Sequence, residues 1–454
     1  MYPALFRHAL FPAYETLTGR GTHRYLAEYR RNQWRDAGDI AQIQLDKLNA
    51  LLDFCWHHVP YLGKRWRAAG LEPRRLACLR ELEAYPVITK PEITANYHEM
   101  SSLPWRGRSM VKTTGGTTGD PFRFEYTMES YARRTAVMWR GYEWAGAGPG
   151  VRAALLWAKP AMPRGWRGIK ERVYQRAFNR RFFDAFDMNE GNLAHYAAAI
   201  TRYRPDVLVG YVRPVVQMAR WINRSGRKIP GLRAVVTGAE ALFAAERAEI
   251  EAAFACPVFN TYGCREFMLI AAECERHGGL HINADHLVVE LVDTSGREVA
   301  GSPGDVVVTD LHNYAMPLVR YANGDRATSA PGIACDCGRG LPILQSVDGR
   351  ILDMIVTTDG RYVPGEFFVH LLLGKTAIRR YQVVQVRPDR LEYRVVLNAT
   401  LPAAERNQIV AETAEVVGPA MQVSVVEVDR IDEAASGKRR VTVSLDSYRA
   451  EQRS

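Results

Sequence analysis

Apolar residues recur at helical spacing soon after the start of the chain. In residues 40–56 they lie three or four positions apart, which places them on one face of a helix. The residues that follow this spacing are Ile40, Ile43, Leu45, Leu48, Leu51 and Leu52. The pattern predicts an amphipathic helix over 40–56 that ends at the segment His58-Val-Pro-Tyr61, because proline does not continue a helix.

Short apolar runs alternate with helical stretches through the middle of the chain. A helical stretch over 127–145 precedes the apolar run 151–158. Further apolar runs lie at 206–211, 233–240 and 256–263, and the helical stretches between them lie at 213–226 and 242–254. Runs of this length are typical of buried strands in a parallel sheet. The alternation predicts an α/β architecture whose ligand sites gather at the carboxyl ends of the strands.

The pattern changes from about residue 281. Segments 286–293, 304–311 and 317–325 alternate apolar and polar residues and are joined by Gly, Ser and Pro turns. This pattern predicts an antiparallel or barrel-like β-rich part of the same large domain.

A separate compact unit is predicted beyond Arg350. It contains alternating segments and one helical stretch, at 380–386, 391–399, 403–417, 421–429 and 439–446. We therefore predict an α/β protein with two domains. A large N-terminal domain, residues 1–349, combines parallel sheet and helices with the β-rich part, and a small α+β domain spans residues 350–454.

Composition restricts the class of protein. The 454 residues are 47% hydrophobic and 24% charged, and no apolar run reaches the ~18 residues of a membrane-spanning helix. Arg7 and His8 interrupt the N-terminal segment where a secretory signal would be apolar. Seven cysteines are too few for a secreted disulfide framework. We expect a soluble cytoplasmic protein without a transmembrane segment.

The charge is basic. Sixty Lys and Arg against fifty Asp and Glu give a net charge of +10, which favours phosphate-bearing ligands, acidic partners or an anionic surface. Residues 159–181 hold eight basic residues against Glu171 alone. A solvated helix face is the simpler interpretation, and docking of a polyanion or an acidic carrier protein is the alternative. A zinc-containing nucleic-acid-binding protein fits less well, because the cysteines lack finger spacing, so no nucleic-acid partner is predicted.

Seven consecutive residues consist only of threonine and glycine. They are Thr113, Thr114, Gly115, Gly116, Thr117, Thr118 and Gly119. Glycines let backbone N–H groups turn inward and threonine hydroxyls add donors, so this Thr/Gly loop suits a polyphosphate. It is not a Walker loop, because Asp120 follows where that motif has lysine.

The Thr/Gly loop resembles the phosphate-binding loop of the adenylate-forming enzymes, and later segments match further motifs of that superfamily in the same order. These are Tyr262-Gly-Cys-Arg-Glu266, Gly304–Thr309 with Pro317–Asp325, Gly349–Ile355 and Ser436-Gly-Lys438. Three other segments are similar to the phenylacetate-CoA ligase branch, including its relatives in capsular polysaccharide gene clusters. They are Val59-Pro-Tyr61, Tyr85–Lys90 and Thr237-Gly-Ala-Glu240. The resemblance covers roughly residues 45–445.

This resemblance implies a two-step reaction with a small-molecule carboxylic acid as substrate. The acid attacks the α-phosphate of ATP and releases pyrophosphate, and the acyl-adenylate then passes its acyl group to coenzyme A. ATP, Mg²⁺ and coenzyme A are the expected cofactors, and the C-terminal domain is expected to be mobile.

The resemblance also implies roles for individual residues. Lys438 and Glu266 would be catalytic, with Glu266 holding Mg²⁺ and Lys438 neutralising charge at the α-phosphate. Asp325 would accept hydrogen bonds from both ribose hydroxyls, a role that suits an ionised carboxylate. Together with the Thr/Gly loop, the expected nucleotide contacts are Gly238, Ala239, Glu240, Tyr262, Asp325 and Arg350.

Two departures from the family pattern affect these expectations. Asp120 replaces the common lysine after the loop, so binding of the triphosphate would depend on Mg²⁺ and the threonines. Leu352 stands where the hinge usually has a first acidic residue, and only Asp353 is retained. The second half-reaction therefore stays open, with an amine or an acyl carrier protein as alternative acceptors to coenzyme A. Whether the chain forms a homodimer also stays open.

Four residues suit a structural zinc site. Cys274, His281, Cys335 and Cys337 offer three thiolates and one imidazole, a set that binds Zn²⁺ tetrahedrally. Members of the phenylacetate-CoA ligase branch carry zinc at similar positions. His277 is the competing imidazole ligand, and Cys264 is expected to be a packing residue.

The acid itself is the least defined part of the prediction. The branch commonly takes aryl or arylacetic acids, and aromatic residues are frequent near the expected pocket. They are Tyr126, Tyr131, Trp139, Tyr142, Trp157 and Tyr211. Core packing is the ordinary use of such residues, so none of them identifies the substrate.

Overall fold

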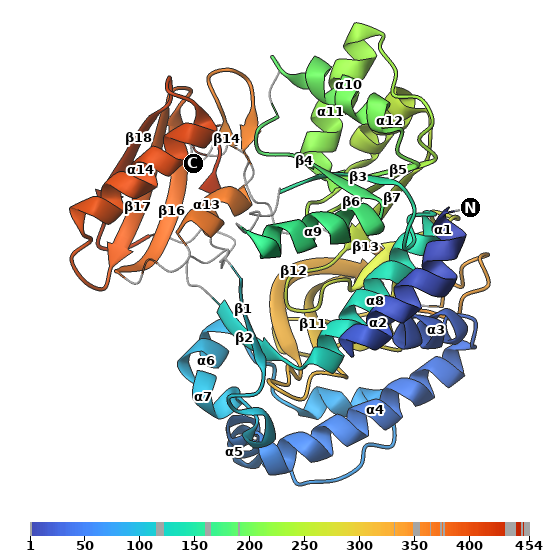
Figure 1. Ribbon diagram of the computed structural model, residues 1–454. Coiled ribbons are helices and arrows are strands. Elements are labelled where there is room, and N and C mark those ends of the chain that lie inside the picture. The colour runs from blue at the N-terminus through green and yellow to red at the C-terminus, as the bar shows by residue number, and fades with distance from the viewer. Residues whose placement is uncertain are drawn as a thin grey trace.

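The computed structural model describes most of the chain (Figure 1). The described residues are 2–114, 122–158, 165–188, 191–330, 332–347, 355–363, 365–372, 375, 377–431, 442–445 and 448. Among them, no helix has the length and apolar character that crossing a lipid bilayer requires.

Helices dominate the first hundred residues. They are α1 (Tyr2–Leu5), η1 (Phe6–Leu10), α2 (Phe11–Thr18), α3 (Thr22–Asn32), α4 (Ala37–His58), α5 (Pro60–Ala68), η2 (Leu79–Ala84), α6 (Lys90–Ala95), α7 (Tyr97–Met100) and η3 (Leu103–Trp105). Helix α4 contains the predicted amphipathic helix. The Asp36 carboxylate accepts a hydrogen bond from the Asp39 N–H and caps its start, and Pro60 follows its end.

The first two residues of the Thr/Gly loop, Thr113 and Thr114, end a strand that belongs to an antiparallel pair which the sequence pattern did not predict. Strand β1 (Met110–Thr114) pairs antiparallel with β2 (Phe122–Tyr126), and Thr114 faces Phe122 at the last described pair. The pairing therefore places Thr114 opposite Phe122, two residues that are eight positions apart in the sequence.

Within the described chain, eleven strands form one mixed sheet. In spatial order they are β10 (Leu287–Val292), β11 (Pro303–Asp310), β12 (Tyr321–Ser329), β13 (Ile343–Val347), β9 (Leu280–Ile282), β8 (Ala271–Glu273), β7 (Val258–Tyr262), β6 (Ala234–Gly238), β5 (Val207–Tyr211), β3 (Ala153–Trp157) and β4 (Arg180–Asp184). Strands β3 to β7 run parallel to one another, and the remaining strands pair antiparallel. Both predicted β patterns are therefore present in a single sheet.

Helices cover the parallel half. They are α9 (Trp166–Ala177), α10 (Leu193–Tyr203), α11 (Val212–Ser225) and α12 (Ala244–Phe254), whereas α8 (Met128–Trp144) packs against β8 of the antiparallel half. Helices α10, α11 and α12 share one buried core with strands β3, β5 and β6. Figure 1 shows these three helices grouped together above the parallel strands. The basic segment contains α9, but its end forms strand β4, which was not predicted.

The antiparallel half must curl. Four steps of the sheet separate β12 from β7, which would place them about 19 Å apart in a flat sheet. Yet the Tyr262 hydroxyl at the end of β7 donates to the Asp325 carboxylate of β12 across 2.9 Å. The antiparallel strands are therefore strongly curved, as the predicted antiparallel or barrel-like part of the domain would be.

The C-terminal part has its own hydrophobic core. It contains β14 (Ile355–Val356), β15 (Tyr362–Val363), α13 (Gly365–Leu371), β16 (Ile378–Arg387), β17 (Arg390–Leu397), α14 (Ala403–Val417), β18 (Gln422–Glu427) and β19 (Thr442–Val443). Four of these strands pair in the order β18-β17-β16-β19. The α/β class with a smaller α+β unit at the C-terminus is confirmed. The predicted boundary at 349/350 lies outside the described residues.

A buried ion pair ties helix α8 to the antiparallel half. Arg140 donates to both carboxylate oxygens of Asp285, at 2.9 and 2.8 Å, and both side chains are fully buried. The same guanidinium donates to the Asn283 side chain. The buried charge of Arg140 is therefore neutralised by Asp285 and hydrogen-bonded by Asn283.

Replacing Asp285 with alanine is expected to lower the free energy of unfolding by about 3–5 kcal/mol. The change leaves the Arg140 charge buried without its carboxylate, which costs more than the pair itself contributes. Urea unfolding of the full chain would measure the loss. The exposed Lys64–Glu99 pair is the control, since Glu99→Ala should cost about 1 kcal/mol or less. Equal effects of the two variants would contradict the prediction.

Candidate functional site

The loop after β6 has a conformation that limits its residues. A Cβ at Gly238 would lie 2.6 Å from the Thr261 hydroxyl, so glycine is needed there. Ala239 follows with a φ of 69°, a left-handed conformation that is unusual for alanine. The Glu240 carboxylate then accepts a hydrogen bond from the backbone N–H of Arg213, at 2.7 Å. The predicted adenine-bordering residues thus form a tight turn at the carboxyl end of β6.

Three buried side chains form a closed hydrogen-bonded group at the end of β7. Tyr262 donates to Asp325, and the Asn323 amide donates to both the Tyr262 hydroxyl, at 2.7 Å, and the Asp325 carboxylate, at 2.9 Å. Burial, followed by the charge of Asp325, raises the pKa of Tyr262 well above its usual value. The tyrosine therefore stays protonated and acts as a donor. The structure brings together two predicted nucleotide contacts and adds Asn323.

Glu266 lies nearby and is also buried. The Tyr321 hydroxyl donates to its carboxylate at 3.1 Å. The Tyr321 ring stacks on Phe122 of the hairpin, with ring centres 5.7 Å apart. Glu266 is therefore linked through one tyrosine to the strand that follows the Thr/Gly loop. Mg²⁺ takes one or two carboxylates together with substrate phosphates, so the Glu266 carboxylate has the chemistry expected of the predicted Mg²⁺ ligand.

Lys112 is a candidate that the sequence analysis missed. It pairs across the hairpin with buried Phe124, and its ammonium lies 5.9 Å from the Tyr126 ring centre. Burial lowers its pKa to about 8, with contributions from Arg265 and Arg134, whereas Glu266 raises it. Glu266 is thus the acidic side chain whose charge acts on this ammonium. In the sequence, only the position of Lys112 directly before the Thr/Gly loop could have indicated it as a candidate phosphate-binding residue.

Three aromatic rings meet at the carboxyl ends of the parallel strands. Trp157, the last residue of β3, stacks on Tyr211, the last residue of β5, with ring centres 4.0 Å apart. Phe186, which follows β4, stacks on Tyr211 at 6.1 Å and contacts Phe367 of α13 at 6.2 Å. Of the aromatic residues selected from the sequence, Trp139 instead packs on Phe178.

The four predicted zinc ligands converge. The Cys274 and Cys335 sulfurs are 3.7 Å apart, the Cys337 sulfur is 3.4 Å from the His281 Nε2, and all four ligand atoms lie within 4.8 Å of one another. A tetrahedral ion with Zn–S bonds of about 2.3 Å places its sulfurs about 3.8 Å apart. The cysteine pair is too far apart for a disulfide, whose S–S bond is about 2.05 Å.

Backbone groups support this ligand arrangement. The Leu341 carbonyl accepts from the His281 Nδ1 at 3.2 Å, which leaves Nε2 free to face the sulfurs. The N–H groups of Arg276 and Arg339 point at the Cys274 and Cys337 sulfurs. His277 is not part of this cluster, because its Nδ1 lies 3.3 Å from the Glu273 carboxylate. The donor set fits zinc through His281.

Several predicted site residues cannot be placed. Gly115, Gly116, Thr117, Thr118 and Gly119, together with Arg350 and Lys438, lie outside the described residues. Thr113 and Thr114 lie in β1 at the base of the loop.

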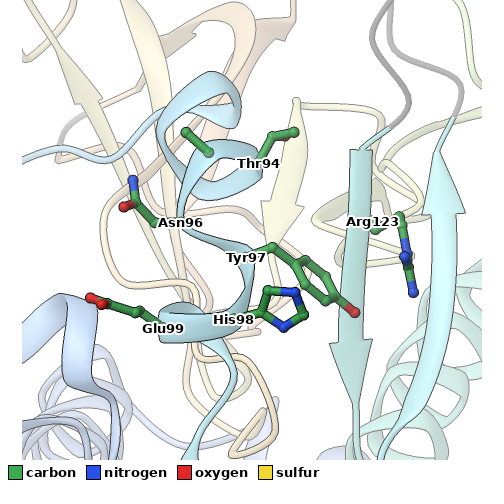
Figure 2. A pocket seen from close by; sticks show the side chains of 7 residues that line it. Thr94, Asn96, Tyr97, His98, Glu99 and Arg123 are labelled. Carbon is green, nitrogen blue, oxygen red and sulfur yellow. The ribbon is translucent and has the colours of Figure 1, made fainter. Parts of the chain in front are cut away.

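A cavity of about 410 Å³ lies beside the hairpin (Figure 2). Residues 94–99 and Arg123 line it, and none of them is a predicted site residue. Its polar groups already have partners: the Tyr97 hydroxyl donates to Glu125 at 2.6 Å, and Arg123 lies 5.0 Å over the Tyr97 ring. Burial and Glu125 raise the pKa of Tyr97 to about 12. These contacts brace the base of the hairpin.

Comparison with known proteins agrees with the motifs. The sequence profile of the CapK C-terminal domain matches residues 355–444. Phenylacetate-coenzyme A ligase of Pseudomonas putida is 26% identical over 387 residues, which cover 82% of this chain and 86% of that protein. Protein CapK of Staphylococcus aureus is 24% identical and covers 67% of this chain and 66% of its own.

A solved structure supports the fold. A 2-hydroxyisobutyryl-CoA ligase in complex with 2-HIB-AMP and CoA superposes with a TM-score of 0.64 at 21% identity, covering 93% of this chain and 94% of that one. In fold, the chain is similar to this acyl-CoA ligase over nearly its whole length. In sequence, it is similar to phenylacetate-coenzyme A ligases and to protein CapK, and its C-terminal part matches the CapK C-terminal domain.

Proposed function

We propose that the protein is an acid-CoA ligase that activates a carboxylic acid with ATP and transfers the acyl group to coenzyme A. The hydrogen-bonded group of Tyr262, Asn323 and Asp325 carries this proposal. It presents a buried carboxylate whose orientation is held by two neighbouring donors. The related phenylacetate-CoA ligases support the reaction class.

The reaction balances in two displacements. A carboxylate oxygen of the acid attacks the α-phosphorus of ATP, and the bond to the β-phosphate oxygen breaks, so pyrophosphate leaves. The thiolate of coenzyme A then attacks the acyl carbon, and AMP leaves with the electron pair of the acyl–oxygen bond. Neither step needs a covalent bond to the protein, so catalysis depends on positioning and charge neutralisation.

Each predicted site residue would have its own role in binding the nucleotide or neutralising its charge. Asp325 would accept from the ribose hydroxyls, and the turn from Gly238 to Glu240 would border the adenine. Glu266 would hold Mg²⁺, which neutralises phosphate charge when it is bound. The Thr/Gly loop would donate to the phosphates, Arg350 would contact the nucleotide near the hinge, and Lys438 would neutralise charge at the α-phosphate.

Lys112 supplies a cation that Asp120 does not. Replacing Lys112 with methionine is expected to lower ATP–pyrophosphate exchange by about tenfold or more, because one charge-assisted contact to phosphate is lost. The charged form predominates below its pKa of about 8, so this contribution falls as the pH rises through 8. The methionine variant should lack that fall, whereas Lys112→Arg should retain the activity at high pH. Identical pH profiles of wild type and Lys112→Met would contradict the role.

An aryl or arylacetic acid is the proposed substrate. The stack of Trp157 and Tyr211 at the carboxyl ends of β3 and β5 supports this choice, because parallel sheets bind ligands at that edge. Domain organisation is proposed as residues 1–349 and 350–454, and the CapK profile match lies inside the second range.

The test is ATP–pyrophosphate exchange with a panel of aryl, arylacetic and medium-chain acids. Exchange reports adenylate formation without assuming an acceptor. One acid class should drive exchange, and Lys438→Ala should abolish it. Adding coenzyme A should then yield the acyl-CoA and AMP. Exchange without any acyl-CoA product would reject coenzyme A as the acceptor, and amines or an acyl carrier protein would be tested next.

A further inference from the structure

Helix α9 exposes a continuous apolar stripe. Trp166, Ile169 and Val173 are 77%, 44% and 62% exposed. They stand three, four and seven positions apart, so with about 3.6 residues per turn they lie on one face of the helix. The opposite face is packed, with Phe178 buried just beyond its end. Large side chains seldom remain together in solvent without a binding partner.

Basic residues border this stripe on both sides. On the helical projection, Arg172 and Arg176 lie along one edge, and Lys170 lies along the other. All three are exposed, and none forms an ion pair with another described residue. The single acidic residue of the helix, Glu171, lies away from the stripe and accepts from Gln175. The face therefore combines exposed apolar side chains with unneutralised positive charge.

A second helical segment packs beside α9 and also exposes large apolar side chains. Tyr14 of α2 contacts Tyr174 of α9 at 5.8 Å between ring centres, and Phe11 contacts Phe178 at 5.7 Å. Leu10 and Leu17, on the same segment, are 45% and 88% exposed. The exposed apolar residues therefore extend beyond a single helix.

We infer that the α9 face docks on an anionic lipid surface. An interfacial helix places its apolar stripe at the boundary of the acyl chains while flanking Lys and Arg side chains reach the headgroups on both sides. This is the arrangement of α9, and the net charge of +10 adds long-range attraction. A second copy of the chain fits less well, since two such faces would bring six positive charges together. The inference does not depend on the proposed reaction.

The position of α9 gives the docking a direction. It is the crossover between the parallel strands β3 and β4, so it runs against them, and its Trp166 end lies toward their carboxyl ends. Trp157 and Phe186 lie at the same edge. A docked molecule would therefore present its proposed acid site close to the lipid.

Vesicle sedimentation tests the inference with the full-length protein. We expect binding to phosphatidylcholine vesicles that contain phosphatidylglycerol, weak binding to phosphatidylcholine alone, and release by salt. Changing Lys170, Arg172 and Arg176 together to glutamate should weaken binding by at least about tenfold. Trp166→Ser with Val173→Ser should also weaken it, although the charge is unchanged.

Matched controls separate the face from total charge. Lys228, Arg379 and Arg380 are also exposed, and changing them to glutamate alters the net charge equally. Leu103→Ser with Val426→Ser removes exposed apolar area elsewhere. Both controls should bind as wild type does. ATP–pyrophosphate exchange with a soluble acid should be unchanged in the α9 variants, which also confirms that they fold.

Three results would overturn the inference. The first is absence of vesicle binding, and the second is an equal loss in the charge-matched control. The third is a protein partner in place of the lipid: either a second copy of the chain or an acidic carrier protein binds, the α9 changes abolish that binding, and vesicles do not bind. That result would assign the α9 face to a protein partner.

Discussion

Asp325→Asn is expected to lower ATP–pyrophosphate exchange by about a hundredfold, mainly through a higher KM for ATP. The proposed ribose contacts are hydrogen bonds to a charged acceptor, each contributing about 1.5–3 kcal/mol. An amide of the same shape retains one acceptor oxygen but loses the charge. Tyr262 and Asn323 can still donate hydrogen bonds to that oxygen, so the fold should remain intact. Steady-state exchange at varied ATP concentrations measures the change.

Tyr262→Phe is the matched control for this prediction. It removes the hydroxyl that donates to Asp325 but leaves the carboxylate in place. Its effect should be several times smaller than that of Asp325→Asn. If Asp325→Asn kept the wild-type KM for ATP, Asp325 would be only a structural partner of Tyr262, and the proposed nucleotide site would have to be abandoned.

Removal of any one zinc ligand is expected to empty the cluster and lower the unfolding temperature by about 5–10 °C. The ligands come from two separated parts of the chain, so the ion would link the β8–β9 region to the loop before β13. Cys274→Ser and His281→Ala should each reduce the metal content, measured by mass spectrometry, from about one zinc per chain to near zero. Calorimetry would report the loss of stability.

Two controls make this prediction specific. Cys78 is exposed and lies outside the cluster, so Cys78→Ser should retain zinc. His277→Ala should also retain it, because that imidazole faces Glu273. Purified wild-type protein without zinc, or loss of zinc in His277→Ala but not in His281→Ala, would contradict the assignment.

The hydrophobic pattern was sufficient for most of the fold. It predicted β5, β6 and β7 to within about two residues, together with the helices between them, because a buried parallel strand needs a nearly continuous apolar run. Strand β4 was missed because Arg180 and Arg181 continue the basic run of α9. Its sequence, Arg-Arg-Phe-Phe-Asp, lies at the edge of the sheet, where such charge is tolerated.

The candidate site was predicted only in part. Motif order predicted Tyr262, Glu266 and Asp325 as site residues, and the structure brings Tyr262 and Asp325 into contact. Asn323 and Lys112 were missed because their roles follow from the curl of the sheet and the pairing of the hairpin. Both are long-range contacts that residue spacing does not contain. The Cys/His cluster was predicted from the chemistry of its side chains and from the family resemblance, and the structure brings its four ligand atoms together through His281 rather than His277.

The curl of the antiparallel half has a further consequence. Side-chain hydrogen bonds between Tyr262 of β7 and Asn323 and Asp325 of β12 close a loop of five strands, β7, β8, β9, β13 and β12. A nucleotide bound by residues of both β7 and β12 would hold these two strands together. Amide protons of β8 and β9, which contain none of the proposed nucleotide contacts, are then expected to exchange more slowly when the nucleotide is bound, because it would oppose local opening between β7 and β12.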